Sequence, residues 1–202
     1  MAKNAEKEII IPSLKDIQTE RKRIRRGFLY RQALRSTVSV LVVVAAVAVL
    51  ITTLFLPILQ ISGDSMSPTL EHDEIVVLLK TQDFKQGDLI GFYYQGKILL
   101  KRVIALSGDE VAIDTEGNVY VNGEILDEPY VTDKSLGDCD LEFPYKVPGT
   151  SYFVLGDRRS NSVDSRNSMI GAISRDDIIG KIFIRVWPLS KFGFVFSIDP
   201  EK

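Results

Sequence analysis

The sequence predicts a mainly β protein anchored by one amino-terminal transmembrane helix. Three observations support this fold class: 28 uncharged residues from Ser36 to Gly63, short β-branched and aromatic runs beyond them, and turn signals between those runs. We expect a basic segment at 1–35, the transmembrane helix at 36–59 and a second domain at 60–202. That domain should form a β-barrel-like or mixed antiparallel sheet, with a small β insert at roughly 110–150.

The composition limits the domain count and the chemistry. A chain of 202 residues has room for one globular domain and a small appendage. Its one cysteine, Cys139, excludes an intramolecular disulfide, and its one histidine, His72, is too little for a His-based zinc site. We expect no bound metal and no cofactor.

The apolar centre of the uncharged run, Val38–Leu59, is long enough to cross a bilayer, for which about 20 apolar residues suffice. A core helix of a soluble protein seldom runs so far without a charge. A cleaved secretory signal has an apolar region of about 7–15 residues near the start of the chain. The cleavage-like Ala46–Ala48 lies in the middle of this segment. We interpret the run as an uncleaved membrane anchor.

The charge distribution predicts the orientation of that anchor. Residues 1–35 carry a net charge of +6 and residues 36–202 carry −8. The Lys/Arg cluster at 21–26, with Arg31 and Arg35, lies within about 15 residues of the span, and such clusters stay cytoplasmic. We expect a single-pass plasma-membrane protein with a cytoplasmic amino terminus and an extracytoplasmic domain. The basic segment should contact the bilayer and its anionic lipid, not nucleic acid.

Beyond the span, β-rich runs alternate with turn signals as in a sheet or barrel. No long helical periodicity appears after Leu70, and the Pro- and acid-rich stretch 126–147 is expected to leave the sheet. The predicted strands are 74–79, 88–94, 97–104, 110–113, 119–121, 152–155 and 182–187.

A serine just past the membrane is the first candidate for chemistry. Gly63 makes the backbone flexible before Ser65, and Pro68 fixes it afterwards. Such a turn can expose a hydroxyl beside backbone N–H groups. On its own, the pattern also fits a structural serine.

A lysine on a predicted strand is the second candidate. Alternation places Lys101 on the same strand face as Leu99 and Val103. Apolar neighbours desolvate an amine and lower its pKa below the usual value of about 10.4, so that a neutral amine could take a proton from Ser65. The alternative is an edge-strand lysine whose amine reaches solvent.

Two known arrangements that activate a serine hydroxyl are excluded. His72 is the only imidazole and lies in an acidic turn, so no Ser-His-Asp triad is convincing. Pro68 stands where a Ser-x-x-Lys motif starting at Ser65 needs its lysine.

The third candidate is the segment 153–166, where a predicted strand runs into a loop with two Asp and three Arg. Dense polar loops bind a ligand or stabilise a site through hydrogen bonds and ion pairs. A plain solvated loop is the alternative.

In their order and spacing, these segments resemble the type I signal peptidases, the membrane-anchored Ser/Lys endopeptidases of bacteria. The resemblance runs from the anchor to Trp187–Pro188, and the insert matches at 117–123 and Glu128–Tyr130. The matching boxes are Ser65–Leu70, Gly87–Ile90, Lys101–Asp109 and Gly156–Arg166.

The resemblance implies that Ser65 is the nucleophile and Lys101 the general base. Ser162 would hydrogen-bond to the lysine amine and orient it. The implied supporting ion-pair network consists of Asp164, Arg166 and Arg102. No metal or other cofactor takes part.

Three positions depart from the family pattern in whole or in part. Gly63 occupies a position where one branch has a serine that donates to the oxyanion, so the chain resembles the Gram-positive branch. The oxyanion would then be stabilised by hydrogen bonds from the Ser65 N–H and from a second donor, to which the resemblance assigns no residue. Arg158 replaces the usual Asn and is expected to alter loop packing and not the mechanism. Ser107 replaces a common Pro at a turn.

The implied activity is removal of amino-terminal signal peptides from exported preproteins. The peptide would bind as an added strand, with small side chains of the Ala-x-Ala type before the cut. The implied pocket residues are Ile61, Met66, Leu70, Leu99 and Leu100. Two alternatives remain: a self-cleaving Ser/Lys protease of the repressor type, and an inactive membrane-anchored binding module.

Overall fold

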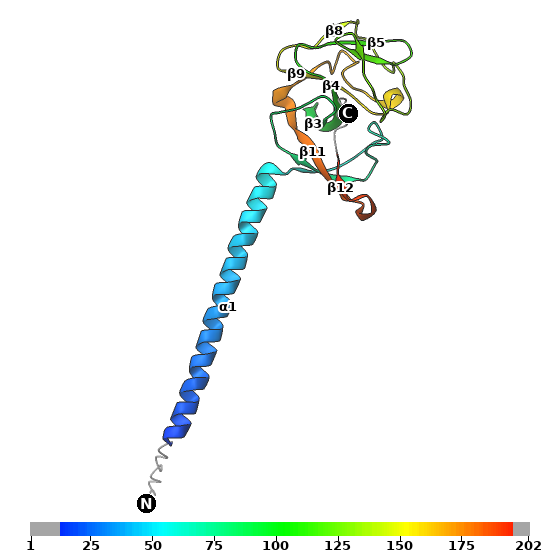
Figure 1. Cartoon of the computed structure of the whole chain (residues 1–202). Coiled ribbons are helices and arrows are strands. Elements are labelled where there is room, and N and C mark those ends of the chain that lie inside the picture. The colour runs from blue at the N-terminus through cyan, green and yellow to red at the C-terminus, as the bar shows by residue number, and fades with distance from the viewer. Residues whose placement is uncertain (1–12, 196–202) are drawn as a thin grey trace, which may run out of the picture. The chain divides into compact units, whose positions relative to one another are not determined.

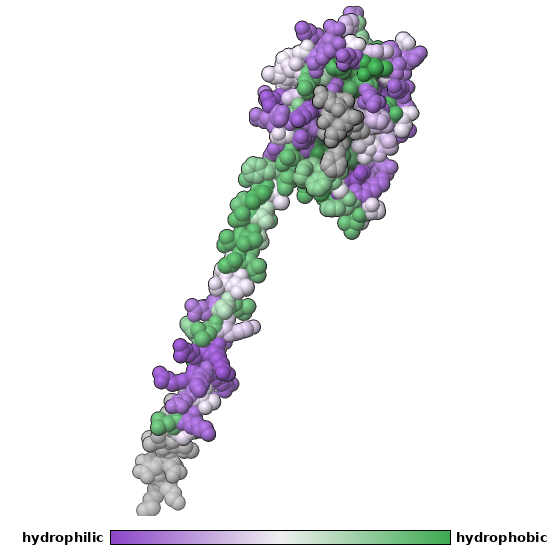
Figure 2. Space-filling view, in the orientation of Figure 1, coloured by the Kyte–Doolittle hydropathy of each residue, from purple (hydrophilic) through white to green (hydrophobic). Residues whose placement is uncertain are grey.

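The computed structural model describes residues 13–195, which divide into two units at Ile51/Thr52 (Figure 1). Helix α1, Leu14–Phe55, contains 42 residues with exposed side chains wherever these are described. Within residues 13–195 it is the one helix long and apolar enough to cross a membrane. Figure 2 shows a basic part of this helix in purple, followed by an apolar part in green.

The helix differs from the predicted span of 36–59 at both ends. It already begins at Leu14 and includes the basic stretch, because Lys, Arg and Leu are good helix formers and no Pro interrupts them. It ends at Phe55, because Pro57 has no N–H to donate and strand β1 begins at Ile58. Residues 1–12 of the predicted basic segment lie outside the described part.

The main sheet contains eight antiparallel strands in the order β1-β2-β11-β3-β4-β9-β10, with β12 paired to β11. This path does not return from β10 to β1, so the strands form an open sheet and not a closed barrel. Their bounds are β1 Ile58–Gln60, β2 Ile75–Leu79, β3 Leu89–Tyr94, β4 Lys97–Ala105, β9 Ser151–Leu155, β10 Ile173–Ser174, β11 Ile178–Trp187 and β12 Gly193–Phe194.

A second, four-stranded sheet has the order β7-β6-β5-β8 and lies within the predicted insert. Its β6–β7 turn contains Asn122 and Gly123, whose positive φ angles of 53° and 84° suit a tight hairpin. The bounds are β5 Glu110–Ile113, β6 Val119–Val121, β7 Glu124–Ile125 and β8 Tyr145–Lys146.

Strand β4 is the element that connects the core to the site. Its residues from Lys101 to Ala105 are all buried, because both of its faces are covered. Val103 packs with Ile90 and Phe92 in one cluster, whereas Ile104 packs in another. Polar side chains on this strand therefore need partners inside the protein.

The remaining described elements are short 3₁₀ turns, and no α-helix follows Phe55 within residues 13–195. The turn Arg159–Asn161 lies in the polar loop after β9. The other two turns are Arg175–Asp177 and Leu189–Lys191.

Candidate active site

The Lys101 amine and the Ser65 hydroxyl meet although they come from different elements. Ser65 lies in the turn after β1, which Gly63 enters with a φ of 97°, and Lys101 lies in β4. Lys101 Nζ donates a hydrogen bond of 2.7 Å to Ser65 Oγ. A nucleophile and a base at this separation can exchange a proton.

The surroundings of Lys101 favour its neutral form. The residue is 3% exposed. Burial lowers the pKa of its amine to about 8, with the carboxylate of Asp164 opposing the change and the cation of Arg166 adding to it. Near pH 8, a large fraction of these amines is therefore unprotonated and able to accept a proton.

Asp164 and Arg166 form a buried ion pair, as the family resemblance implies. Arg166 Nε and Nη2 donate to the two oxygens of Asp164 at 2.8 and 2.9 Å. Arg166 also donates to the backbone carbonyls of Ser135, Leu136 and Arg159. The pair therefore joins the loop after β9 to the insert.

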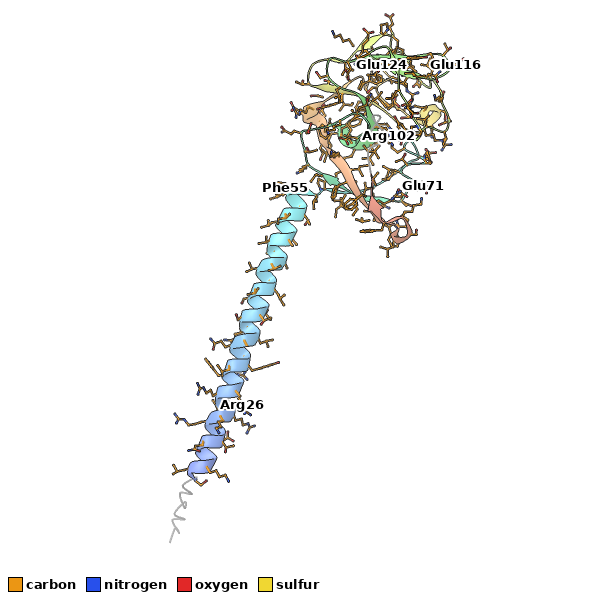
Figure 3. The ribbon with its side chains drawn as sticks, in the orientation of Figure 1. Arg26, Phe55, Glu71, Arg102, Glu116 and Glu124 are labelled. Atoms are coloured by element: carbon orange, nitrogen blue, oxygen red, sulfur yellow. The ribbon has the colours of Figure 1, made fainter. Side chains whose placement is uncertain are left out.

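Arg102 does not join that pair. Its guanidinium binds both oxygens of Asp157 at 2.8 and 2.6 Å and donates to the Gly87 carbonyl at 3.0 Å. Its carbon Cζ lies 3.8 Å from the centre of the Tyr130 ring. The expected network of three residues is therefore two separate ion pairs, because Arg102 has its own carboxylate. Figure 3 labels Arg102 in the interior of the domain.

The expected hydrogen bond between Ser162 and Lys101 is absent. Ser162 is 5% exposed, and its Oγ is one of two buried side-chain atoms without a partner within the described residues. The Lys101 amine donates to Ser65 instead. Ser162 lies tightly against Gly156, where an added Cβ would fall 2.2 Å from this Oγ.

A cavity of about 360 Å³ opens beside Ser65 and Lys101. Four of the five expected pocket residues line it: Ile61, Met66, Leu99 and Leu100. Leu70 does not, because it is fully buried in the core with Met66 and Val76. Leu59, Gln60 and Ile98 line it as well, and the sequence reasoning missed them.

A third buried ion pair links the insert to the loop after β9. Arg159 binds both carboxylate oxygens of Glu128, and both side chains are 1% exposed. The Tyr130 hydroxyl donates to Glu128 at 3.0 Å. The Glu128–Tyr130 motif was the available signal for this contact, but the sequence alone assigned it no role.

Further contacts hold the turn that carries Ser65. Arg158 forms an ion pair with Asp64, which also accepts a hydrogen bond of 2.9 Å from Asn161 Nδ2. His72 is exposed, as expected, and its Nδ1 accepts from the Gly63 N–H at 3.1 Å. Within the described residues, no cluster of three or more His, Cys, Asp or Glu side chains could hold a metal ion.

Comparisons with known proteins identify the family of the chain. The family model described as signal peptidase, peptidase S26, matches residues 34–187. Signal peptidase I P of Bacillus subtilis subsp. natto is 36% identical over 166 residues, which cover 76% of this chain and 88% of that protein. The probable signal peptidase I-2 of Synechocystis is 34% identical over 154 residues, 70% of this chain and 67% of that protein.

A solved signal peptidase I from Enterococcus faecalis V583 is 29% identical and aligns with 49% of this chain and 96% of its own, at a TM-score of 0.41. The family model covers well over half of the chain, and several curated relatives exceed 30% identity across most of it. The chain therefore belongs to the signal peptidase family, peptidase S26.

Proposed function

We propose that this membrane-anchored serine endopeptidase removes signal peptides from exported preproteins with Ser65 as nucleophile and Lys101 as general base. One observation carries the assignment of roles: the 2.7 Å hydrogen bond between a buried lysine amine and a serine hydroxyl beside a cavity. The relatives named signal peptidase I supply the substrate class.

The reaction is acyl transfer. Neutral Lys101 accepts the proton of Ser65 Oγ as this oxygen attacks the scissile carbonyl. The lysine then gives the proton to the departing amine, which is the new amino terminus of the mature protein. In the second half, Lys101 takes a proton from water as the water oxygen attacks the acyl carbonyl, and it returns this proton to Ser65 Oγ as the signal peptide leaves.

The Ser65 N–H is the first donor to the oxyanion. Among the described residues, it donates to no other group, so it is available to the carbonyl oxygen as negative charge develops there. Gly63 has no side-chain hydroxyl to add. Ser62, which is next to Gly63 in the chain and lines the same cavity, is our candidate for the second donor.

The cavity supports selection of small side chains. Its apolar walls include Ile61, Met66, Leu99 and Leu100, and we propose that they favour small side chains such as Ala or Gly over larger ones. Strand β1 precedes the Ser65 turn and forms one end of the main sheet. An extended peptide can add to such an edge through main-chain hydrogen bonds.

The proposed setting is a single-pass arrangement in the plasma membrane. The basic part of α1 stays in the cytoplasm against anionic lipid, and residues 60–202 act outside. The exposed apolar helix and the charge asymmetry support this arrangement.

The function is tested by incubating the purified full chain, in detergent, with a preprotein and locating the cut by mass spectrometry. We expect one cut after a small residue at the end of the signal peptide, and none with Ser65→Ala. Binding without cleavage would favour the inactive module. Cleavage of the chain itself, with the preprotein left intact, would favour the self-processing alternative.

A further inference from the structure

The turn that carries Ser65 is held from outside by the loop after β9. The Arg158 guanidinium forms an ion pair with Asp64, the residue before the serine. Asn161 Nδ2 donates to the other oxygen of the same carboxylate at 2.9 Å. The Arg158 backbone N–H donates to the Ser65 carbonyl at 3.1 Å. These contacts join residues more than 90 positions apart in the chain.

The contacts lie on both sides of one peptide unit. The peptide bond between Asp64 and Ser65 contains the Ser65 N–H, the proposed donor to the oxyanion. The Arg158 guanidinium holds Asp64, before this bond, through its side chain. The Arg158 backbone N–H holds Ser65, after this bond, through its carbonyl. A donor helps catalysis only when it points at the place where the oxyanion forms, so its orientation has a direct effect on rate.

The Arg158–Asp64 ion pair is too exposed to contribute much to the stability of the fold. The side chains of Arg158 and Asp64 are 45% and 47% exposed. Ion pairs in such positions contribute little to folding, because water screens them and both side chains lose freedom. The loop after β9 is already held by three buried ion pairs, which contain Arg102, Arg159 and Arg166. The exposed pair is therefore not needed to keep this loop folded.

We propose that Arg158 is a positioning residue that orients the Ser65 N–H through its ion pair with Asp64. The inference rests on the proposed function, in which Ser65 is the nucleophile and its N–H binds the oxyanion. Asparagine, the residue that the family pattern has at this position, is shorter and uncharged. Asparagine could not supply the cation of this ion pair. We call the Arg158–Asp64 ion pair the clamp, and it is a feature of this chain.

The test compares Arg158→Asn, Arg158→Lys, Asp64→Asn and the double variant D64N/R158N in preprotein cleavage. Arg158→Asn should lower kcat by about 10- to 100-fold with KM and melting temperature unchanged. Arg158→Lys should recover part of the loss, because it restores the charge with a single donor group. The double variant should lose no more than the worse single variant, since both substitutions break one contact.

Hydrogen exchange of the full chain without substrate measures the clamp independently of activity. Arg158→Asn should speed exchange in residues 62–70. The matched control is Arg23→Asn, which removes the exposed ion pair with Glu20 in α1 and should change neither exchange in residues 62–70 nor kcat. Wild-type kcat in Arg158→Asn, or additive losses in the double variant, would overturn the inference. A wild-type chain that cleaves no preprotein would instead contradict the proposed function, and the exchange data would then decide whether the clamp exists.

Discussion

The amine of Lys101 lies 2.7 Å from the hydroxyl of Ser65, and the two residues are 36 positions apart in the chain. The lysine is 3% exposed and the serine borders a cavity. Protonating a buried amine is costly, so the fold itself keeps this base partly neutral near physiological pH. The same burial that prepares the base must reduce the stability of the folded protein.

Replacing the buried lysine should therefore stabilise the protein. A pKa of about 8 in place of 10.5 corresponds to about 3 kcal/mol at neutral pH. Between these two pH values the unfolded chain binds the proton more tightly, so wild-type stability should rise with pH through that window. Lys101→Met should exceed wild type by about this amount in denaturant unfolding at pH 7, with the difference vanishing above pH 10.5. Lys97→Met, an exposed substitution on the same strand, should keep the wild-type pH dependence.

The Asp164–Arg166 pair should be needed for folding and, through it, for activity. Both side chains are at most 1% exposed. Arg166→Ala leaves a buried carboxylate without its cation, which costs about 3–5 kcal/mol. Melting temperature and cleavage rate should fall together, whereas Val163→Ala, at an exposed neighbour, should change neither. Lost activity with an unchanged melting curve would show that Arg166 acts in the chemistry.

The insert should stabilise the loop after β9 through the carboxylate of Glu128. Glu128→Gln removes the charge that pairs with the buried guanidinium of Arg159. We expect a loss of about 3 kcal/mol in the free energy of unfolding. Glu124→Gln is the matched control, because Glu124 is exposed on the same insert (Figure 3). Equal unfolding curves for the two variants would show that the insert does not support the loop.

The orientation in the membrane can be tested in intact cells. Protease added from outside should digest the region after Ile61 and leave residues 1–35 protected. The reason is the net charge of +6 on that segment against −8 on the remainder. Labelling of the amino terminus by a reagent that cannot cross the membrane would reverse the assigned topology.

Sequence patterns predicted most of the sheet, because its longer strands combine β-branched residues with clear turn signals. The 97–104 and 110–113 runs became β4 and β5 with nearly the same bounds. Strands β7, β8, β10 and β12 were missed, since two residues carry no periodicity, and β1 was missed because it begins inside the predicted membrane span. The start of α1 was missed because the basic stretch was interpreted only from its charge. A positive charge beside a membrane span does not show whether the backbone is helical.

Prediction of the site succeeded where a local motif was enough. Ser65 and Lys101 each lie in a recognisable box, and the structure brings them together. Which arginine pairs with which carboxylate could not be read from the sequence, because the polar loop contains several of each. The partner of Arg102 depends on how β4 passes the loop after β9, which is a property of the fold.

The central claim is that Lys101 acts as the neutral base, and the pH dependence of kcat/KM for preprotein cleavage tests it most directly. The rate should rise with pH and level off above about 8, where the amine becomes unprotonated. His72→Ala should keep this profile. Lys101→Arg should lose more than about 1,000-fold at every pH, because guanidinium cannot give up its proton. Activity retained in Lys101→Arg, or abolished in His72→Ala, would contradict the account.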